Sequence, residues 1–281
     1  MTGDSELEGL EALEALVANA RPTAKRLILS VLSQPNLSCL PISQLISWGA
    51  LFDQSASAIR VTTSRLVKDR LLEKTGRGMY MIGPQGMALK SKAGEWIDVL
   101  DQVRPWNGGW LSVYTGHLGK TDRRNVRLYQ RAFRLLGFKE LVDGLWIRPD
   151  NLIRQPDQIH HQLCQLGLDP GAVMLRSDRL SQNRLEDPLA LWPQAELNAA
   201  YDHLIACLAQ SQARLDGRSL RDVTRETFIV GEHIIRQINA DPLLPDGFID
   251  AAKRRVLIEA MKAYSDFSHP FWVAFLDVGD S

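Results

Sequence analysis

The stretch Ser55–Ile82, SASAIRVTTSRLVKDRLLEKTGRGMYMI, joins a helical pattern to a tight hairpin and decides the fold of the N-terminal region. Ser55 is a good N-cap residue, and the pattern predicts a helix from there to about residue 70. At 100° per residue one face is apolar and carries Ile59, Thr63 and Leu66. The opposite face is polar and carries Ser57, Val61, Ser64 and Lys68, flanked by Arg60 and Arg65. We therefore expect an amphipathic helix with a basic outer face.

The hairpin and the residues before the helix complete a recognisable order. Residues 71–74 and 79–82 predict two short strands around the turn Gly76-Arg77-Gly78. Upstream, residues 24–32 and a segment starting at Pro41 predict two shorter helices, with a turn at Pro35–Cys39 between them. Three helices followed by a basic hairpin is the order of a winged helix-turn-helix domain, which we assign to residues 22–84.

The side chains of this segment suit contacts with DNA. A helix fits the major groove, and a basic hairpin suits phosphates or the minor groove. The predicted DNA-binding residues are Ser57, Arg60, Ser64, Arg65, Lys68, Lys74 and Arg77. Two alternatives stay open: Arg65 can pair with the neighbouring Asp69, and Arg77 can sit on an ordinary solvated turn.

The net charge of zero hides a gradient along the chain. Residues 22–92 hold ten lysines and arginines against three acids, a net charge of +7, whereas residues 186–281 hold nine bases and fifteen acids, a net of −6. A compact basic segment is typical of a protein that binds a polyanion, although a solvated face without a partner has the same composition. We expect the basic segment, and not the acidic tail, to contact double-stranded DNA.

The rest of the chain predicts an α+β protein with further segments. Residues 1–21 indicate an acidic helix, and residues 85–104 a connecting helix over Gln85–Gln102. Residues 105–180 predict the order βαββαβ, with a hairpin at Asp143-Gly144, which favours a ferredoxin-like domain. Residues 186–281 predict an all-helical domain, with helices at 194–215, 219–239 and 248–264, for dimerisation and effector binding.

Three groups of residues resemble one family in unbroken order over roughly residues 22–265. They are Ile59-Arg60-Val61 to Ser64-Arg65-Leu66-Val67 with Gly76-Arg77-Gly78-Met79-Tyr80; Trp106–Trp110 with Leu135–Phe138 and Gly144–Pro149; and His233, Arg236 and Asp241–Pro245. Together they resemble the PaaX-type regulators of phenylacetate catabolism. The family usually carries two adjacent arginines in the wing, where this chain has Arg77-Gly78, and a different sequence at residues 246–250. The resemblance implies a repressor of a catabolic operon that a coenzyme A thioester, often an aryl-acetyl one, releases from DNA.

The basic groups of the helical tail are the candidates for binding such an effector. Its phosphates need arginine or lysine, and its acyl group needs an apolar cleft. The predicted effector-binding residues are Arg225, His233, Arg236 and Arg254, of which His233 and Arg236 match the family pattern. Apolar candidates nearby are Phe228, Tyr264, Phe267 and Trp272. These aromatic residues can equally be helical core, and Lys253-Arg254-Arg255 can equally be a solvated helix face.

A basic stripe in the middle of the chain has no assigned role. Arg123, Arg127, Arg131 and Arg134 are spaced by four, four and three residues, which puts them on one helical face with Arg124 beside it. The stripe can contact flanking DNA, contact coenzyme A phosphates, or be a solvated face.

An enzyme is the rival interpretation, namely a nucleic-acid-processing protein targeted by its winged helix. A nuclease with this central fold would need a metal-binding aspartate after its first strand, where Tyr114-Thr115-Gly116 lies instead. His160 and Cys164 form half a metal site at most, without a second ligand pair. We therefore expect no catalytic residues, metal or cofactor.

The chain also predicts its setting and its assembly. The cysteines, Cys39, Cys164 and Cys207, are few and far apart, which fits a reducing cytoplasm. Residues 1–20 are too acidic for a signal peptide, and no apolar run approaches the length of a membrane span. We expect a cytoplasmic homodimer that reads an inverted repeat, because two-fold symmetric proteins bind palindromic sites.

Overall fold

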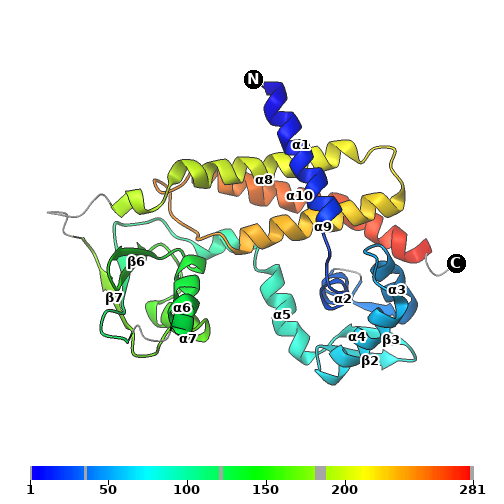
Figure 1. Ribbon diagram of the computed structural model, residues 1–281, viewed down its shortest axis with the longest axis horizontal. Coiled ribbons are helices and arrows are strands. Elements are labelled where there is room, and N and C mark those ends of the chain that lie inside the picture. The colour runs from blue at the N-terminus through cyan, green and yellow to red at the C-terminus, as the bar shows by residue number, and fades with distance from the viewer. Residues whose placement is uncertain (1, 35–36, 120–122, 181–187, 279–281) are drawn as a thin grey trace. The chain divides into compact units, whose positions relative to one another are not determined.

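The computed structural model describes residues 2–34, 37–119, 123–180 and 188–278 of 281, with side chains from Gly9 onward. The fold class is α+β, as predicted, with two small antiparallel sheets among many helices (Figure 1). The chain forms two compact units. Unit 1 contains the chain up to Ile97, His203–Arg236 and the segment from Ile258 onward; unit 2 contains Asp98–Asp202 and Gln237–Leu257. The segment 186–281 is therefore divided between both units.

Unit 1 begins with five helices and a three-stranded sheet. The elements are α1 (Thr2–Asn19), α2 (Ala24–Leu32), β1 (Cys39–Pro41), α3 (Ile42–Ala50), α4 (Ala56–Lys68), β2 (Leu72–Gly76), β3 (Met79–Ile82) and α5 (Pro84–Gly94). The strand order is β1-β3-β2, with both pairs antiparallel. The predicted succession of three helices and a hairpin is present, and Figure 1 shows α2, α3 and α4 gathered around this sheet.

Two predictions of local structure in this region are wrong. Residues 35–36 of the predicted turn Pro35–Cys39 lie outside the described residues, and its last residue, Cys39, instead begins β1, whose three residues pair with β3. So short a strand leaves no periodic pattern, and pairing with β3 alone defines it. The single helix predicted over Gln85–Gln102 is two elements, because α5 ends at Gly94 and a 3₁₀ helix, η1, occupies Val99–Gln102. Glycine is a poor helix former, so a break at Gly94 is favourable.

The helical part of unit 1 supplies an aromatic core to the N-terminal elements. Trp48 of α3 is 1% exposed and makes edge contacts with Phe228 and Trp272, at centroid distances of 5.5 and 5.9 Å. Phe228 lies on α9 (Leu220–Asn239) and Trp272 on α10 (Ala251–Val278). The N-terminal elements and these two helices thus share one hydrophobic core.

The last helix is longer than predicted, because α10 continues from Ala251 through Pro270 to Val278 instead of ending near residue 264. Proline inside a helix costs about 3 kcal/mol. Beyond Pro270, however, Trp272 and Leu276 are buried, and burial of each side chain stabilises the fold by about 1.5–3 kcal/mol, which offsets that cost.

Among the described residues, no helix combines the length and the apolar character that a membrane span requires.

Unit 2 is built around a four-stranded sheet. It starts with η1, and its further elements are β4 (Trp110–Tyr114), α6 (Arg123–Leu135), β5 (Lys139–Val142), β6 (Leu145–Pro149), α7 (Pro156–Gln165) and β7 (Val173–Ser177), followed by η2 (Pro188–Leu191) and α8 (Gln194–Arg214), which continues into unit 1. The strand order is β5-β6-β4-β7 and every pair is antiparallel. The predicted order βαββαβ is present. Gly144 turns the predicted hairpin with φ +76°, a conformation that glycine adopts without strain.

Candidate nucleic-acid interface and ligand pocket

Helix α4 has the two faces that its sequence predicts. Ser55 caps it by accepting a hydrogen bond from the amide of Ala58 at 3.1 Å. The inner face is buried through Ile59, Thr63 and Leu66, all 2% exposed or less. The outer face is exposed and consists of Ser57, Arg60, Val61, Ser64, Arg65 and Lys68. Burial of the inner face fixes the rotation of α4, so the outer face stays exposed to solvent.

The predicted DNA-binding cations make no ion pairs among the described residues. The expected alternative was an ion pair between Arg65 and Asp69, and no such pair exists between these two described residues. Within the described part of the chain, Arg60, Lys68, Lys74 and Arg77 make no ion pair either. The cations on the outer face of α4 and on the hairpin are therefore exposed and not held in ion pairs within the described part of the chain.

The hairpin between β2 and β3 is a well-anchored projection. Arg77 is exposed in its turn, next to Gly78, whose φ is +78°. The carbonyl of Gly78 accepts a hydrogen bond from the amide of Ile42 at 2.9 Å, which ties the turn to the start of α3. Lys74 pairs across the hairpin with Tyr80 and is also exposed. All seven predicted DNA-binding side chains are therefore exposed on α4 and this hairpin.

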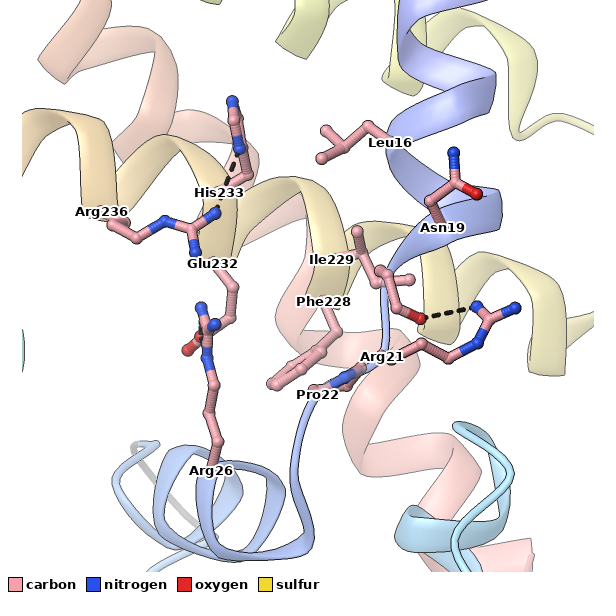
Figure 2. Close-up of a pocket in the computed structure, with 11 residues that line it drawn as sticks. Leu16, Asn19, Arg21, Pro22, Arg26, Phe228, Ile229, Glu232, His233 and Arg236 are labelled. Carbon is pink, nitrogen blue, oxygen red and sulfur yellow. Dashed lines mark hydrogen bonds and ion pairs between the residues drawn. The ribbon is translucent and has the colours of Figure 1, made fainter.

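A second feature of unit 1 is a pocket of about 340 Å³ (Figure 2). Its walls come from the end of α1, the link to α2, α2 itself and the middle of α9. The lining residues are Leu16, Asn19, Ala20, Arg21, Pro22, Arg26, Phe228, Ile229, Glu232, His233 and Arg236. Apolar and cationic groups thus face the same space.

The polar side of the pocket contains one closed ion pair. Glu232 accepts from Nε of Arg26 at 2.5 Å and from Oγ of Ser30 at 2.8 Å, so both its oxygens are occupied. Arg236 approaches Nδ1 of His233 with a guanidinium nitrogen at 3.3 Å. Burial, helped by the charges of Arg236 and His203, lowers the pKa of His233 below its usual 6.5. A neutral His233 accepts this hydrogen bond, so the charge of Arg236 is not neutralised by its neighbour.

The structure brings together only part of the predicted effector-binding set. His233, Arg236 and the predicted apolar residue Phe228 line the pocket. Arg225 does not, and its guanidinium lies 5.9 Å from the ring centroid of Phe52. Arg254 belongs to unit 2, where it is 4% exposed, 3.8 Å from a carboxylate oxygen of Asp241, and not on a solvated face.

Sequence reasoning missed three charged residues of the pocket, namely Arg21, Arg26 and Glu232. Arg26 and Glu232 are separated by 206 positions, and no local pattern relates them. The predicted aromatic residues Tyr264, Phe267 and Trp272 are not among those lining it; Tyr264 and Trp272 are buried.

The other motif residues have structural roles in unit 2. Arg148 donates to the carbonyl oxygen of Leu136 and, at 3.4 Å, to that of Pro242. Asn151 donates to the carbonyl of Leu243 at 2.7 Å. Burial lowers the pKa of Arg148 to about 9, so it remains a cation at neutral pH. The motifs at 144–149 and 241–245 are thus joined by hydrogen bonds.

The half metal site is not completed among the residues that the structure describes. His160 and Cys164 lie 3.9 Å apart (Nδ1 to Sγ), and Nε2 of His160 is 3.1 Å from the carbonyl oxygen of Ala172. No group of three His, Cys, Asp or Glu side chains in these ranges is placed to hold a metal ion.

Comparisons with known proteins inform on the fold alone. No protein-family model matches the chain, and no curated protein matches it. Among solved structures, the chain is similar to the uncharacterized protein Rv0674 from Mycobacterium tuberculosis, with 23% identity and a TM-score of 0.63. The match covers 92% of this chain and 99% of that one. The two chains therefore share an arrangement of elements over nearly their whole lengths.

Proposed function

We propose that this protein is a DNA-binding transcriptional regulator whose residues 22–84 form a winged helix-turn-helix. The observation that carries the proposal is the exposed basic face of α4, held outward by a buried opposite face. Exposed arginines and lysines on a projecting helix and hairpin suit a polyanion.

In this proposal α4 reads the major groove. Its 13 residues extend about 20 Å, and a helix fits a groove about 12 Å wide. Ser57, Arg60 and Ser64 face the base edges, and Arg65 and Lys68 approach phosphates. The hairpin places Arg77 and Lys74 on phosphates or in the minor groove.

The wider proposal follows from the resemblance to PaaX-type regulators and from the strand order of unit 2, which suits a ferredoxin-like fold. The protein is then a cytoplasmic, non-enzymatic homodimer that binds an inverted repeat and represses a catabolic operon. A coenzyme A thioester, carrying an aryl or acyl group, releases it.

The pocket beside α9 is the proposed effector site. A volume of about 340 Å³ lies within the usual range for small ligands and suits the acyl or aryl group rather than the whole thioester. Arg21 and Arg236 supply charge for an anionic portion, since neither has a carboxylate partner among the described residues. Phe228 and Ile229 supply the apolar wall.

Binding in the same pocket provides a mechanism by which an effector releases the protein from DNA. Arg26 belongs to α2, which packs directly on α4, and its ion pair with Glu232 ties α2 to α9. An anionic ligand would compete with Glu232 for Arg26. By linkage, an effector that binds free protein better than DNA-bound protein weakens DNA binding by the same factor.

The test is to select genomic DNA fragments with the purified protein, sequence them, and footprint the enriched sites. We expect protected inverted repeats with two half-sites about one helical turn apart. Failure to enrich any sequence would contradict sequence-specific regulation. Cleavage of the fragments on addition of Mg²⁺ or Mn²⁺ would instead favour the nucleic-acid-processing enzyme.

A further inference from the structure

Helix α6 of unit 2 carries a row of arginines that are exposed to solvent. Arg123, Arg127, Arg131 and Arg134 are all exposed. Their spacing of four, four and three residues places them on one side of the helix, over an axial length of about 17 Å.

Packing fixes the direction in which this row points. Ala132 and Phe133 are buried at 1% exposure or less on the inner side of α6. The Phe133 ring stacks on that of Trp146 in β6, at a centroid distance of 4.6 Å and an interplanar angle of 17°. Rotating α6 about its axis would break this contact, so the arginines stay on the outer side.

No carboxylate among the described residues forms an ion pair with this row. Helix α6 contains no aspartate or glutamate. None of its four row arginines makes an ion pair or hydrogen bond with another residue in the described ranges. Like charges three or four residues apart repel each other, and Arg123 lies at the helix N-terminus, where the macrodipole disfavours a cation. An external polyanion would remove both penalties.

We propose that the α6 row binds the sugar-phosphate backbone of double-stranded DNA outside the site read by α4. This inference rests on the proposed DNA-binding function. Phosphates of one strand recur every 3.4 Å along the duplex axis, so the row spans roughly five of them. Arginine is suited to bidentate contacts with phosphate, and every cation of this row is arginine. A single phosphate group would meet only one or two of the four.

The experiment compares two variants of the full chain, each with three charges removed. The α6 variant is Arg127→Gln, Arg131→Gln, Arg134→Gln. The matched control is Arg179→Gln, Arg255→Gln, Lys262→Gln, at exposed cations that make no ion pair among the described residues. Glutamine is a good helix former, and circular dichroism checks that both variants fold. Both are titrated with a selected site in duplexes of about 20 and about 40 base pairs, or two and four helical turns.

If the α6 row binds the DNA backbone, we expect one result for each of the three proteins. The unmodified protein binds the longer duplex more tightly, and its footprint extends beyond the half-sites. The α6 variant loses this length dependence, binds the long duplex roughly tenfold or more weakly, and has a salt slope lower by up to about 2.7, at about 0.9 per phosphate contact. The control variant keeps all three properties.

Two results would contradict DNA binding by the α6 row but would leave the proposed function intact. One is an α6 variant that binds the selected site but matches the control in affinity, salt slope and footprint. Another is tighter retention of single-stranded RNA than of duplex DNA of equal length, lost in the α6 variant alone. Failure of the unmodified protein to bind any duplex would instead refute the DNA-binding proposal itself.

Discussion

Nε of Arg26 on α2 donates to Oε2 of Glu232 on α9 at 2.5 Å, joining two residues that are 206 positions apart. The second oxygen of Glu232 accepts from Ser30, also on α2. The carboxylate is partly buried, with 25% of its side chain exposed. It is therefore one of the polar links between the N-terminal segment and the helical part of unit 1, together with the hydrogen bond from Arg221 to the carbonyl of Ala50.

Removing the carboxylate of Glu232, and with it the contacts to Arg26 and Ser30, should destabilise unit 1. Glu232→Ala leaves Arg26 and Ser30 without their acceptor, and hydrogen bonds to charged groups contribute about 1.5–3 kcal/mol. We expect a loss of about 1–3 kcal/mol in the free energy of unfolding, measured by urea denaturation. Glu259→Ala, at an exposed glutamate of α10, serves as control and should change stability by less than about 0.5 kcal/mol. Equal stability of the two variants would contradict the role given to Glu232.

Removing Trp48 from the aromatic core should lower the free energy of unfolding more than removing the carboxylate of Glu232. Trp48→Ala removes a side chain that is 1% exposed and contacts Phe228 and Trp272. Deleting a buried tryptophan typically costs 3–5 kcal/mol, so we expect about that loss in denaturation experiments. Val61→Ala, on the exposed face of α4, is the comparison and should be nearly neutral. A neutral Trp48→Ala would show that the N-terminal segment does not depend on α9 and α10.

Acidification should weaken the native state through His233. Because the pKa of His233 in the folded chain lies below 6.5, the native state favours the neutral ring. Its stabilising contribution is fully present above about pH 6.5 and is lost as the pH falls through the folded pKa. Melting temperatures between about pH 5 and 8 should show a smaller acid loss in His233→Gln than in the unmodified protein. His161→Gln, at an exposed histidine of α7, should follow the unmodified curve.

The effector proposal predicts a separation of two activities. Arg236→Ala should abolish the response to coenzyme A thioesters while leaving affinity for the selected DNA nearly unchanged, because Arg236 lines the pocket and lies outside α4. A bound thioester at about 100 times its Kd should stabilise the unmodified protein by about 2.7 kcal/mol. Arg255→Ala is the charge-matched control. Calorimetry without heat of binding for a panel of acyl- and aryl-CoA thioesters would discard this effector class.

Assembly can be tested independently of any effector. The proposed inverted repeat requires two copies of α4, one for each half-site. Light scattering should give a dimer at micromolar concentration, and titration should give two chains per selected site. A monomer that binds one chain per site would contradict the proposed homodimer.

Helix α4 and the turn at Asp143-Gly144 were predictable from sequence, because residues close together in the chain specify them. The period of Ile59, Thr63 and Leu66 suffices to orient α4, and Ser55 suffices to start it. The turn at Asp143-Gly144 likewise requires a residue that tolerates positive φ. These signals need no knowledge of the rest of the chain.

Other features depend on tertiary packing and were out of reach. The continuation of α10 past Pro270 depends on burial of Trp272 and Leu276, which local propensity opposes. The pocket depends on the approach of Arg26 to Glu232, and neither residue carries a motif. His233 and Arg236, two of the effector-binding residues predicted from sequence, nevertheless line it.

DNA binding by the outer face of α4 and the hairpin is measured by titrating a selected site with the variant Arg60→Ala, Lys68→Ala, Arg77→Ala. The control is the variant that lacks the charges of Arg179, Arg255 and Lys262. Single variants refine the result: Arg77→Ala should weaken binding to all sequences, and Arg60→Ala or Ser64→Ala should cost about 1–3 kcal/mol of discrimination. We predict that the triple variant loses specific binding and that the control keeps it. Full affinity in the triple variant would show that these side chains do not bind DNA.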